Sequence, residues 1–151
     1  MVREVGKLLT AKNFTVATAE SCTGGLLAST LTDVDGSSAY VRGGVVAYCN
    51  EIKNSVLRVK SETLKNFGAV SQQTAREMAN NVREIFSATI GLSTTGVAGS
   101  PSEDKPHGLV YVAAAGENFS VVREFHFTGT RTEIKAQAVD AALKILAEQL
   151  K

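Results

Sequence analysis

The sequence predicts an α/β fold in which helices cover both faces of a mixed β-sheet. A β-branched run at residues 14–19 ends in a glycine-rich turn and passes directly into a helical pattern, which is how an α/β layer begins. Residues 109–114 and 120–127 have strand patterns and flank a short turn containing Gly116, which indicates an antiparallel hairpin. The 151 residues are 44% hydrophobic and 21% charged, so we expect a single domain, 1–151, with a packed core.

The first part of the chain predicts three helices and two strands. Apolar residues at helical spacing indicate a helix over residues 2–12, and a second helix over 26–31 follows the glycine-rich turn. After a polar loop, residues 43–48 have the small and β-branched composition of a second strand. Asn50 is a good N-cap, so we expect a short helix over residues 51–56.

The rest of the chain predicts three more helices, another strand and the hairpin. Ser61 can cap a short helix that Gly68 closes, and residues 89–94 have the pattern of a third strand. The run Thr-Arg-Thr-Glu at 130–133 is a capping box that opens the last helix. The apolar faces expected for the two longer helices are Ala75, Met78, Ala79, Val82, Ile85 and Phe86, and then Ile134, Ala138, Ala141, Ala142, Ile145 and Leu146.

Composition argues against several classes of protein. The formal net charge is +1, with no basic run and no Trp, which is unlike a nucleic-acid-binding domain. Cys22 and Cys49 have neither a disulfide framework nor metal-ligand spacing, and we expect both to be small buried apolar residues. No apolar run approaches the ~20 residues of a membrane span, and the charged N-terminus is unlike a signal peptide. We therefore expect a cytoplasmic protein with no membrane, nucleic-acid or metal partner.

Three polar segments follow predicted strands, at residues 20–25, 48–53 and 94–99. Ligands of open α/β sheets bind outside the carboxyl ends of the strands, where loops lead into helices. If the three strands run parallel, the three segments meet at one edge of the sheet. This convergence is the main indication of where a site would lie.

The first of these segments, Glu-Ser-Cys-Thr-Gly-Gly at 20–25, places Ser21 at a strand-to-helix turn. N–H groups without an intrahelical partner lie beside such a hydroxyl and can bind an anion or an oxyanion. The alternative is that Ser21 or Thr23 only caps the helix while the glycines allow tight packing, and spacing alone favours that interpretation. The segment matches neither a Gly-x-Ser-x-Gly elbow nor a Walker loop.

A nucleophilic serine needs a base, and the imidazoles are poor candidates. His126 alternates with phenylalanines in a predicted strand, and nothing in the sequence pairs His107 with an acid. Lys53 falls at about the third position of the helix that Asn50 would cap. There the helix dipole and partial burial would both lower the pKa of the amine and make it a better base. The ordinary alternative is a solvent-exposed lysine.

Arg131 lies in the first turn of the last predicted helix. A cation is electrostatically misplaced there unless an anion joins it, which suits an arginine and a helix N-terminus that bind a phosphate together. A surface arginine is the alternative, and position alone favours it.

Seven motifs give the chain a family resemblance. In their order and spacing they resemble the CinA C-terminal domain family over nearly the whole chain, at residues 19–25, 36–38, 46–53, 68–71, 95–99, 105–108 and 127–131. The family includes amidohydrolases that convert nicotinamide mononucleotide and water to nicotinate mononucleotide and ammonia, a reaction of pyridine nucleotide salvage. The resemblance implies a three-layer α/β/α sandwich, no metal or cofactor, and a homodimer or larger homo-oligomer.

The resemblance also implies a serine–lysine catalytic pair, with Ser21 as nucleophile and Lys53 as its base. Tyr48 or Ser38 would shape the proton path. Thr95, Gly96 and Arg131 would bind the phosphate of the substrate. The N–H groups that would hold the oxyanion or contact substrate belong to Cys22, Thr23, Gly24 and Gly25.

The chain departs from the family pattern in the loop after Gly99. Residues 100–102, Ser-Pro-Ser, stand where the family has a proline and a glycine cluster, which affects the expected choice of ligand. Three other functions stay open at this point. They are a nucleotide-binding module of the same fold without turnover, an amidase of another small amide, and a structural oligomeric partner.

Overall fold

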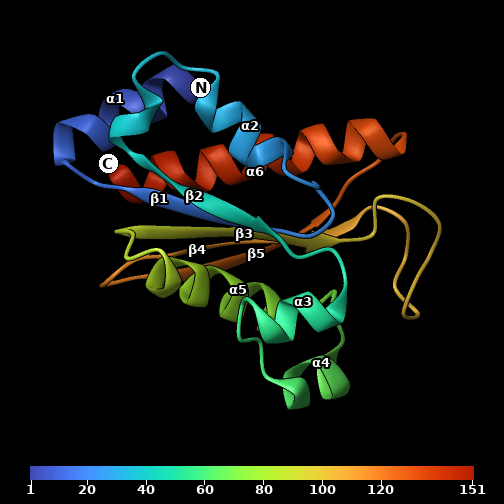
Figure 1. The fold of residues 1–151 in the computed structure, drawn as a ribbon. Helices are drawn as coiled ribbons and strands as arrows, with labels where there is room; N and C mark the ends of the chain where they lie inside the picture. The colour runs from blue at the N-terminus through green and yellow to red at the C-terminus, as the bar shows by residue number, and fades with distance from the viewer.

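The computed structural model describes residues 1–151 and has three layers, with one sheet between two layers of helices (Figure 1). The five strands lie in the order β2-β1-β3-β4-β5. The first three in this order are parallel, and β3-β4-β5 are antiparallel, with the predicted hairpin at the edge. The prediction of a three-layer α/β/α sandwich with a mixed sheet is confirmed. The strands are β1 (Val16–Glu20), β2 (Val41–Val46), β3 (Ile90–Gly96), β4 (Leu109–Ala115) and β5 (Ser120–His126).

Helices cover both faces of the sheet. One layer contains α1 (Val2–Lys12), α2 (Leu26–Thr32) and α6 (Arg131–Leu150), and the other contains α3 (Asn50–Ser55), α4 (Ser61–Phe67) and α5 (Gln72–Ile85) (Figure 1). A single 3₁₀ turn, η1 (Ser37–Ala39), precedes β2. No helix combines the length and the apolar character that crossing a bilayer requires.

The two faces of the sheet are packed with side chains of different size. Alternate residues of a strand face opposite ways, so Val16, Ile90 and Leu92 join the larger core under α1, α2 and α6. The residues between them are small, and α5 lies close against them. A Cβ atom built on Gly91 would stand 2.0 Å from the carbonyl oxygen of Ala79 in α5. Glycine in this strand therefore sets how closely α5 can approach the sheet.

Two short helices begin one residue earlier than predicted. Lys53 N–H donates to the Cys49 carbonyl, so α3 starts at Asn50, whose side chain is not a cap. Likewise α4 starts at Ser61, and Lys60 takes the N-cap position. The predictions of Asn50 and Ser61 as N-caps were wrong, because propensity does not distinguish the cap from the first helical residue.

The other predicted helix ends agree with the structure. Gly68 closes α4 with φ 82°, a left-handed conformation that favours glycine. Thr130 caps α6 by accepting from the N–H of Glu133. The second strand was predicted two residues late, because the segment after Val46 leaves the sheet after one further bond, from Ala47 N–H to the Glu20 carbonyl.

Candidate active site

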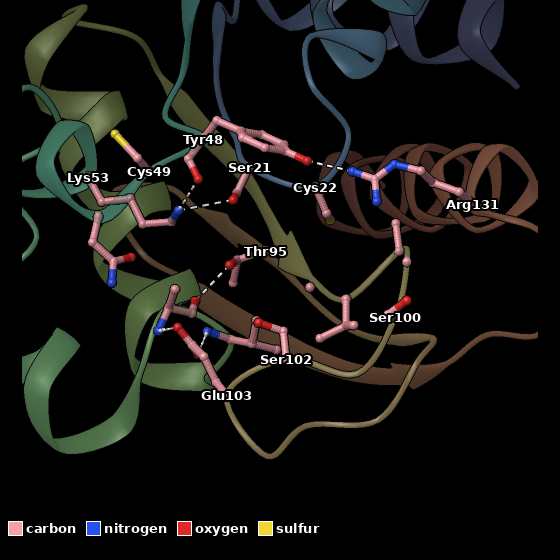
Figure 2. Close-up of a pocket in the computed structure, with 17 residues that line it drawn as sticks. Ser21, Cys22, Tyr48, Cys49, Lys53, Thr95, Ser100, Ser102, Glu103 and Arg131 are labelled. Carbon is pink, nitrogen blue, oxygen red and sulfur yellow. Dashed lines mark hydrogen bonds between the residues drawn. The ribbon is translucent and has the colours of Figure 1, made fainter.

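Ser21 and Lys53 lie in direct contact although 32 residues separate them in the chain. Strand β1 ends at Glu20 and delivers Ser21 to the carboxyl edge of the sheet, and α3 delivers Lys53 to the same edge. Lys53 Nζ lies 3.0 Å from Ser21 Oγ (Figure 2). The two side chains belong to residues that are 8% and 1% exposed. The ordinary alternative of an exposed Lys53 is therefore wrong.

Two carbonyl groups fix the orientation of the Lys53 amine. Nζ donates to the carbonyl oxygens of Ala47, at 2.9 Å, and Tyr48, at 3.3 Å. A neutral amine has two N–H bonds and one lone pair. With both N–H bonds directed at carbonyls, the lone pair faces Ser21 Oγ. The arrangement can accept a proton from the serine hydroxyl, and the resulting ammonium has three acceptors.

Burial lowers the pKa of Lys53, which favours the neutral amine that a base must be. The predicted contribution of a helix dipole was wrong. Helix α3 has only six residues and Lys53 lies in its last turn, where a dipole would favour the cation. Desolvation is the largest cause of the shift, and it acts against that preference.

The N-terminus of α2 is already occupied by the buried carboxylate of Glu20. This carboxylate accepts from the N–H groups of Gly25, Leu27 and Ala28, at 3.2, 2.8 and 3.0 Å. It also accepts from the Thr23 hydroxyl at 2.6 Å. An anion in this position satisfies the unpaired donors of the first helical turn. The helix end is therefore closed to a ligand.

This capping corrects the expectation of a row of free N–H groups beside Ser21. Gly24 N–H donates to the Ser21 carbonyl at 3.1 Å, and Gly25 N–H is bound by Glu20. Thr23 is fully buried, and neither it nor the two glycines line the pocket. Cys22 does line the pocket, and its N–H has no partner among the backbone hydrogen bonds. It is the available oxyanion donor next to Ser21.

The Cys22 thiol is a poor competitor of the serine as nucleophile. Burial raises its pKa to about 12, so the reactive thiolate is not populated near neutral pH. Cys22 and Cys49 form no disulfide, and Cys49 is exposed, against the expectation that both would be buried.

Ser21 and Lys53, which we call the dyad, face a pocket of about 320 Å³ at the carboxyl edge of the parallel strands. All three of the predicted polar segments contribute to it, which agrees with their expected convergence. Thr95 and Gly96 line it at the end of β3. The Thr95 hydroxyl donates to the Ala69 carbonyl at 2.7 Å, so it connects β3 to the loop between α4 and α5.

Arg131 and Tyr48 form a pair at the mouth of the pocket. The Arg131 guanidinium donates to the Tyr48 hydroxyl (Figure 2). A Cβ atom on Gly99 would stand 2.6 Å from Arg131 Nη1, so the guanidinium lies against the backbone there. The N–H groups of Ala98 and Gly99 have no partner among the backbone hydrogen bonds. A cation beside free N–H groups is suited to bind an anion.

The side chains of two predicted site residues do not contact Ser21 or Lys53. The Tyr48 hydroxyl binds Arg131 and not Ser21, and only its carbonyl contacts Lys53. Ser38 is exposed in η1, which precedes β2 and therefore lies at the amino edge, at the other end of the sheet. The expectation that Ser38 borders the site in this chain was wrong.

Neither imidazole contacts Ser21, which agrees with the weak case for a serine–histidine site. His126 lies beside Glu124 on the edge strand. His107 Nδ1 lies 2.5 Å from the Gly99 carbonyl and Nε2 lies 2.9 Å from the Gly129 carbonyl. It therefore bridges the loop before β4 and the loop before α6.

One pocket residue had no signal in the sequence. Glu103 lies in the irregular segment between β3 and β4, and its carboxylate accepts from the N–H groups of Ala69 and Val70, at 3.3 Å each. The segment has no periodicity, so the sequence could not predict that the Glu103 side chain faces the pocket.

Comparisons with known proteins identify the family and agree with the fold. The sequence model of the CinA C-terminal domain family matches residues 1–150 of this chain. A Desulforamulus reducens protein named for competence-damage induction is 49% identical over 142 residues, which are 93% of this chain and 34% of the relative. The chain thus spans about a third of that relative. A crystal structure of a competence/damage inducible protein from Agrobacterium tumefaciens has TM-score 0.96 and 40% identity, covering 99% of this chain and 93% of that one.

Proposed function

This chain belongs to the CinA C-terminal domain family, and from that premise we propose that it is a serine–lysine amidohydrolase. Its substrate is nicotinamide mononucleotide, and its products are nicotinate mononucleotide and ammonia, a step of pyridine nucleotide salvage. The observation that carries the proposal is the 3.0 Å contact between Lys53 Nζ and Ser21 Oγ in a buried site that opens into a pocket.

The acylation step uses the neutral Lys53 amine. Its lone pair takes the Ser21 proton as Oγ attacks the carboxamide carbon, and the carbonyl oxygen becomes an oxyanion. The Cys22 N–H would donate to that oxyanion. The Lys53 ammonium then returns its proton to the amide nitrogen, the C–N bond breaks, and ammonia leaves. An acyl ester on Ser21 remains.

Deacylation repeats the sequence with water as the nucleophile. Lys53 takes a proton from the water that attacks the ester carbon, and it then protonates Ser21 Oγ as the ester bond breaks. The product carries a carboxylate in place of the carboxamide, and the dyad returns to its first state. Arg131 and the N–H groups of Ala98 and Gly99 would hold the phosphate throughout.

The direct test is ammonia release from nicotinamide mononucleotide by the purified chain. We expect turnover by the wild-type protein and a loss of about a thousandfold in Ser21→Ala and Lys53→Met. Lys60→Met is a matched control, because Lys60 is exposed. Thermal unfolding shows whether each variant is folded. Near-normal turnover in either dyad variant would refute the mechanism.

The same assay separates the alternative functions. Thermal stabilisation by nicotinamide mononucleotide without ammonia release would indicate a nucleotide-binding module that has no turnover. Hydrolysis of other small amides but not of this nucleotide would indicate a different amidase. In both cases the substrate assignment made here would fall.

A further inference from the structure

Two side chains of opposite formal charge line the pocket without an ionic partner. The Arg131 guanidinium contacts a phenol, and the Glu103 carboxylate contacts only backbone N–H groups. Neither residue belongs to any of the four ion pairs of the protein. In Figure 2, Glu103 lies across the pocket from the Tyr48–Arg131 pair. The pocket therefore presents a positive charge at one side and a negative charge at another.

The Glu103 carboxylate is held in place by the backbone of two loops. Ser102 and Lys105 exchange backbone hydrogen bonds of 3.1 and 2.8 Å, which closes a tight turn. Glu103 and Asp104 form its corner in the left-handed region, with φ 53° and 58°. The N–H groups of the facing loop orient the carboxylate. The Lys105 amine lies near it but donates to the Phe67 and Val70 carbonyls of that loop and forms no ion pair with Glu103.

Glu103 lies on a wall that leads to the reacting serine. Its carboxylate binds the N–H of Ala69, and the carbonyl of Ala69 accepts from Thr95. The neighbouring Thr94 carbonyl accepts from Ser21 N–H at 2.9 Å. The negative charge of Glu103 is also among the influences that raise the pKa of Lys53, although burial outweighs it. The carboxylate is therefore close enough to act on charges at the dyad.

We propose that Glu103 supplies the counter-charge for a cationic pyridinium ring, so that the pocket prefers N-substituted pyridinium carboxamides to their uncharged dihydropyridine forms. This inference rests on the proposed function. Nicotinamide mononucleotide is dipolar, with an anionic phosphate and a positive ring nitrogen two ring bonds from the carbon that bears the carboxamide. With the phosphate at Arg131 and the carboxamide at Ser21, the ring would lie in the pocket that Glu103 also lines.

The loop that carries Glu103 is the one that departs from the family pattern. The serine-rich residues 100–102 lead directly into the turn formed by Glu103 and Asp104. Two adjacent acids thus occupy one turn, and of the two only Glu103 lines the pocket. Asp104 is exposed and supplies a matched control of the same charge.

The experiment compares two ligands that differ in ring charge. Dissociation constants of nicotinamide mononucleotide and of its reduced, uncharged form are measured by calorimetry in the Ser21→Ala background, which stops turnover. We expect Glu103→Gln to weaken binding of the cationic ligand by about two- to fivefold, the upper part of the range for a single exposed charge pair. Binding of the reduced ligand should change by less than about twofold, and Asp104→Asn should change neither.

Each outcome gives a distinct answer. Equal weakening of both ligands by Glu103→Gln would overturn the inference, because it would show that the residue only shapes the loop. Binding of neither ligand would overturn it as well. Charge-selective binding that depends on Glu103 supports it, even if the wild-type protein releases no ammonia. In that last case only the proposed amidohydrolase activity fails.

Discussion

The wall of the pocket that carries Ser21, Cys22 and Lys53 is buried, whereas the wall that carries Tyr48, Gly99 and Arg131 consists largely of exposed side chains and loop backbone. We call them the dyad wall and the anion wall. The dyad wall is fixed by backbone bonds from neighbouring strands and by two carbonyl groups on one amine. The anion wall is joined by side-chain contacts, those of Arg131 in α6 with Tyr48 and of His107 with the carbonyls of Gly99 and Gly129. Under the proposed function, bond making would thus fall to the buried part of the site and ligand recognition to the exposed part.

The largest effect should come from a change in the dyad wall that keeps its charge. Arginine stays protonated in proteins, so Lys53→Arg retains a cation but removes the base. We expect ammonia release to fall by about a thousandfold, with kcat rather than KM affected. Lys60→Arg should have no effect. A Lys53→Arg variant with substantial turnover would show that the dyad wall contributes charge and not proton transfer.

A change in the anion wall should affect binding instead of chemistry. Arg131→Ala removes the guanidinium that would pair with the phosphate, and we expect KM to rise by about thirtyfold. The value of kcat should stay within about threefold, because the dyad wall is untouched. Arg3→Ala is the control, because Arg3 is an exposed residue of α1. If kcat fell while KM stayed constant, the distinction between the two walls would be wrong.

A smaller effect should follow from crowding the anion wall without removing a charge. Gly99→Ala would place a Cβ atom 2.6 Å from Arg131 Nη1, so the guanidinium would have to move. We expect KM to rise by about fivefold in the wild-type background, a loss of about 1 kcal/mol in binding. In the Arg131→Ala background the same change should add nothing, as a double-mutant cycle would show.

The smallest predicted effect concerns pH and links the two sides of the pocket. The ammonium form of Lys53 cannot accept a proton, so kcat/KM should rise with pH through the pKa of Lys53, which burial places below 10.5. The charge of Glu103 raises that pKa. Glu103→Gln should therefore move the rise to lower pH, and Asp104→Asn should not. A shift to higher pH in pH–rate profiles would contradict the assigned charge relation.

The fold was predictable because its signals are local. Periodicity predicted the helices that carry Val5, Met78 and Ile134, and all three residues are buried. The strand-to-helix turn at Ser21 and the hairpin at Gly116 depend on turn chemistry that the sequence shows directly. The cap of α3 was misplaced by one residue, because Asn50 is acceptable both as a cap and as a first helical residue.

The site was only partly predictable because its decisive facts are tertiary. The burial of Lys53 depends on packing between α3 and the ends of two strands, and no local pattern indicates it. The Glu20 carboxylate was not expected to take the helix N-terminus, since a cap usually precedes its helix directly. Ser38 was assigned by resemblance alone, and the strand order places it at the wrong end of the sheet. Motif position does not fix which edge a loop occupies.

The bridge made by His107 implies that binding and reaction respond to acidity in opposite directions. Both ring nitrogens face carbonyl oxygens, Gly99 and Gly129, and only the imidazolium can donate to both. These contacts raise the pKa of His107, so the bridge is complete in acid, below about 6.5, and weakens as the pH rises through the raised value. It braces the backbone on both sides of Arg131, whereas Lys53 gains basicity as the pH rises. A rise in pH should therefore loosen the backbone around Arg131 while it makes Lys53 a better base.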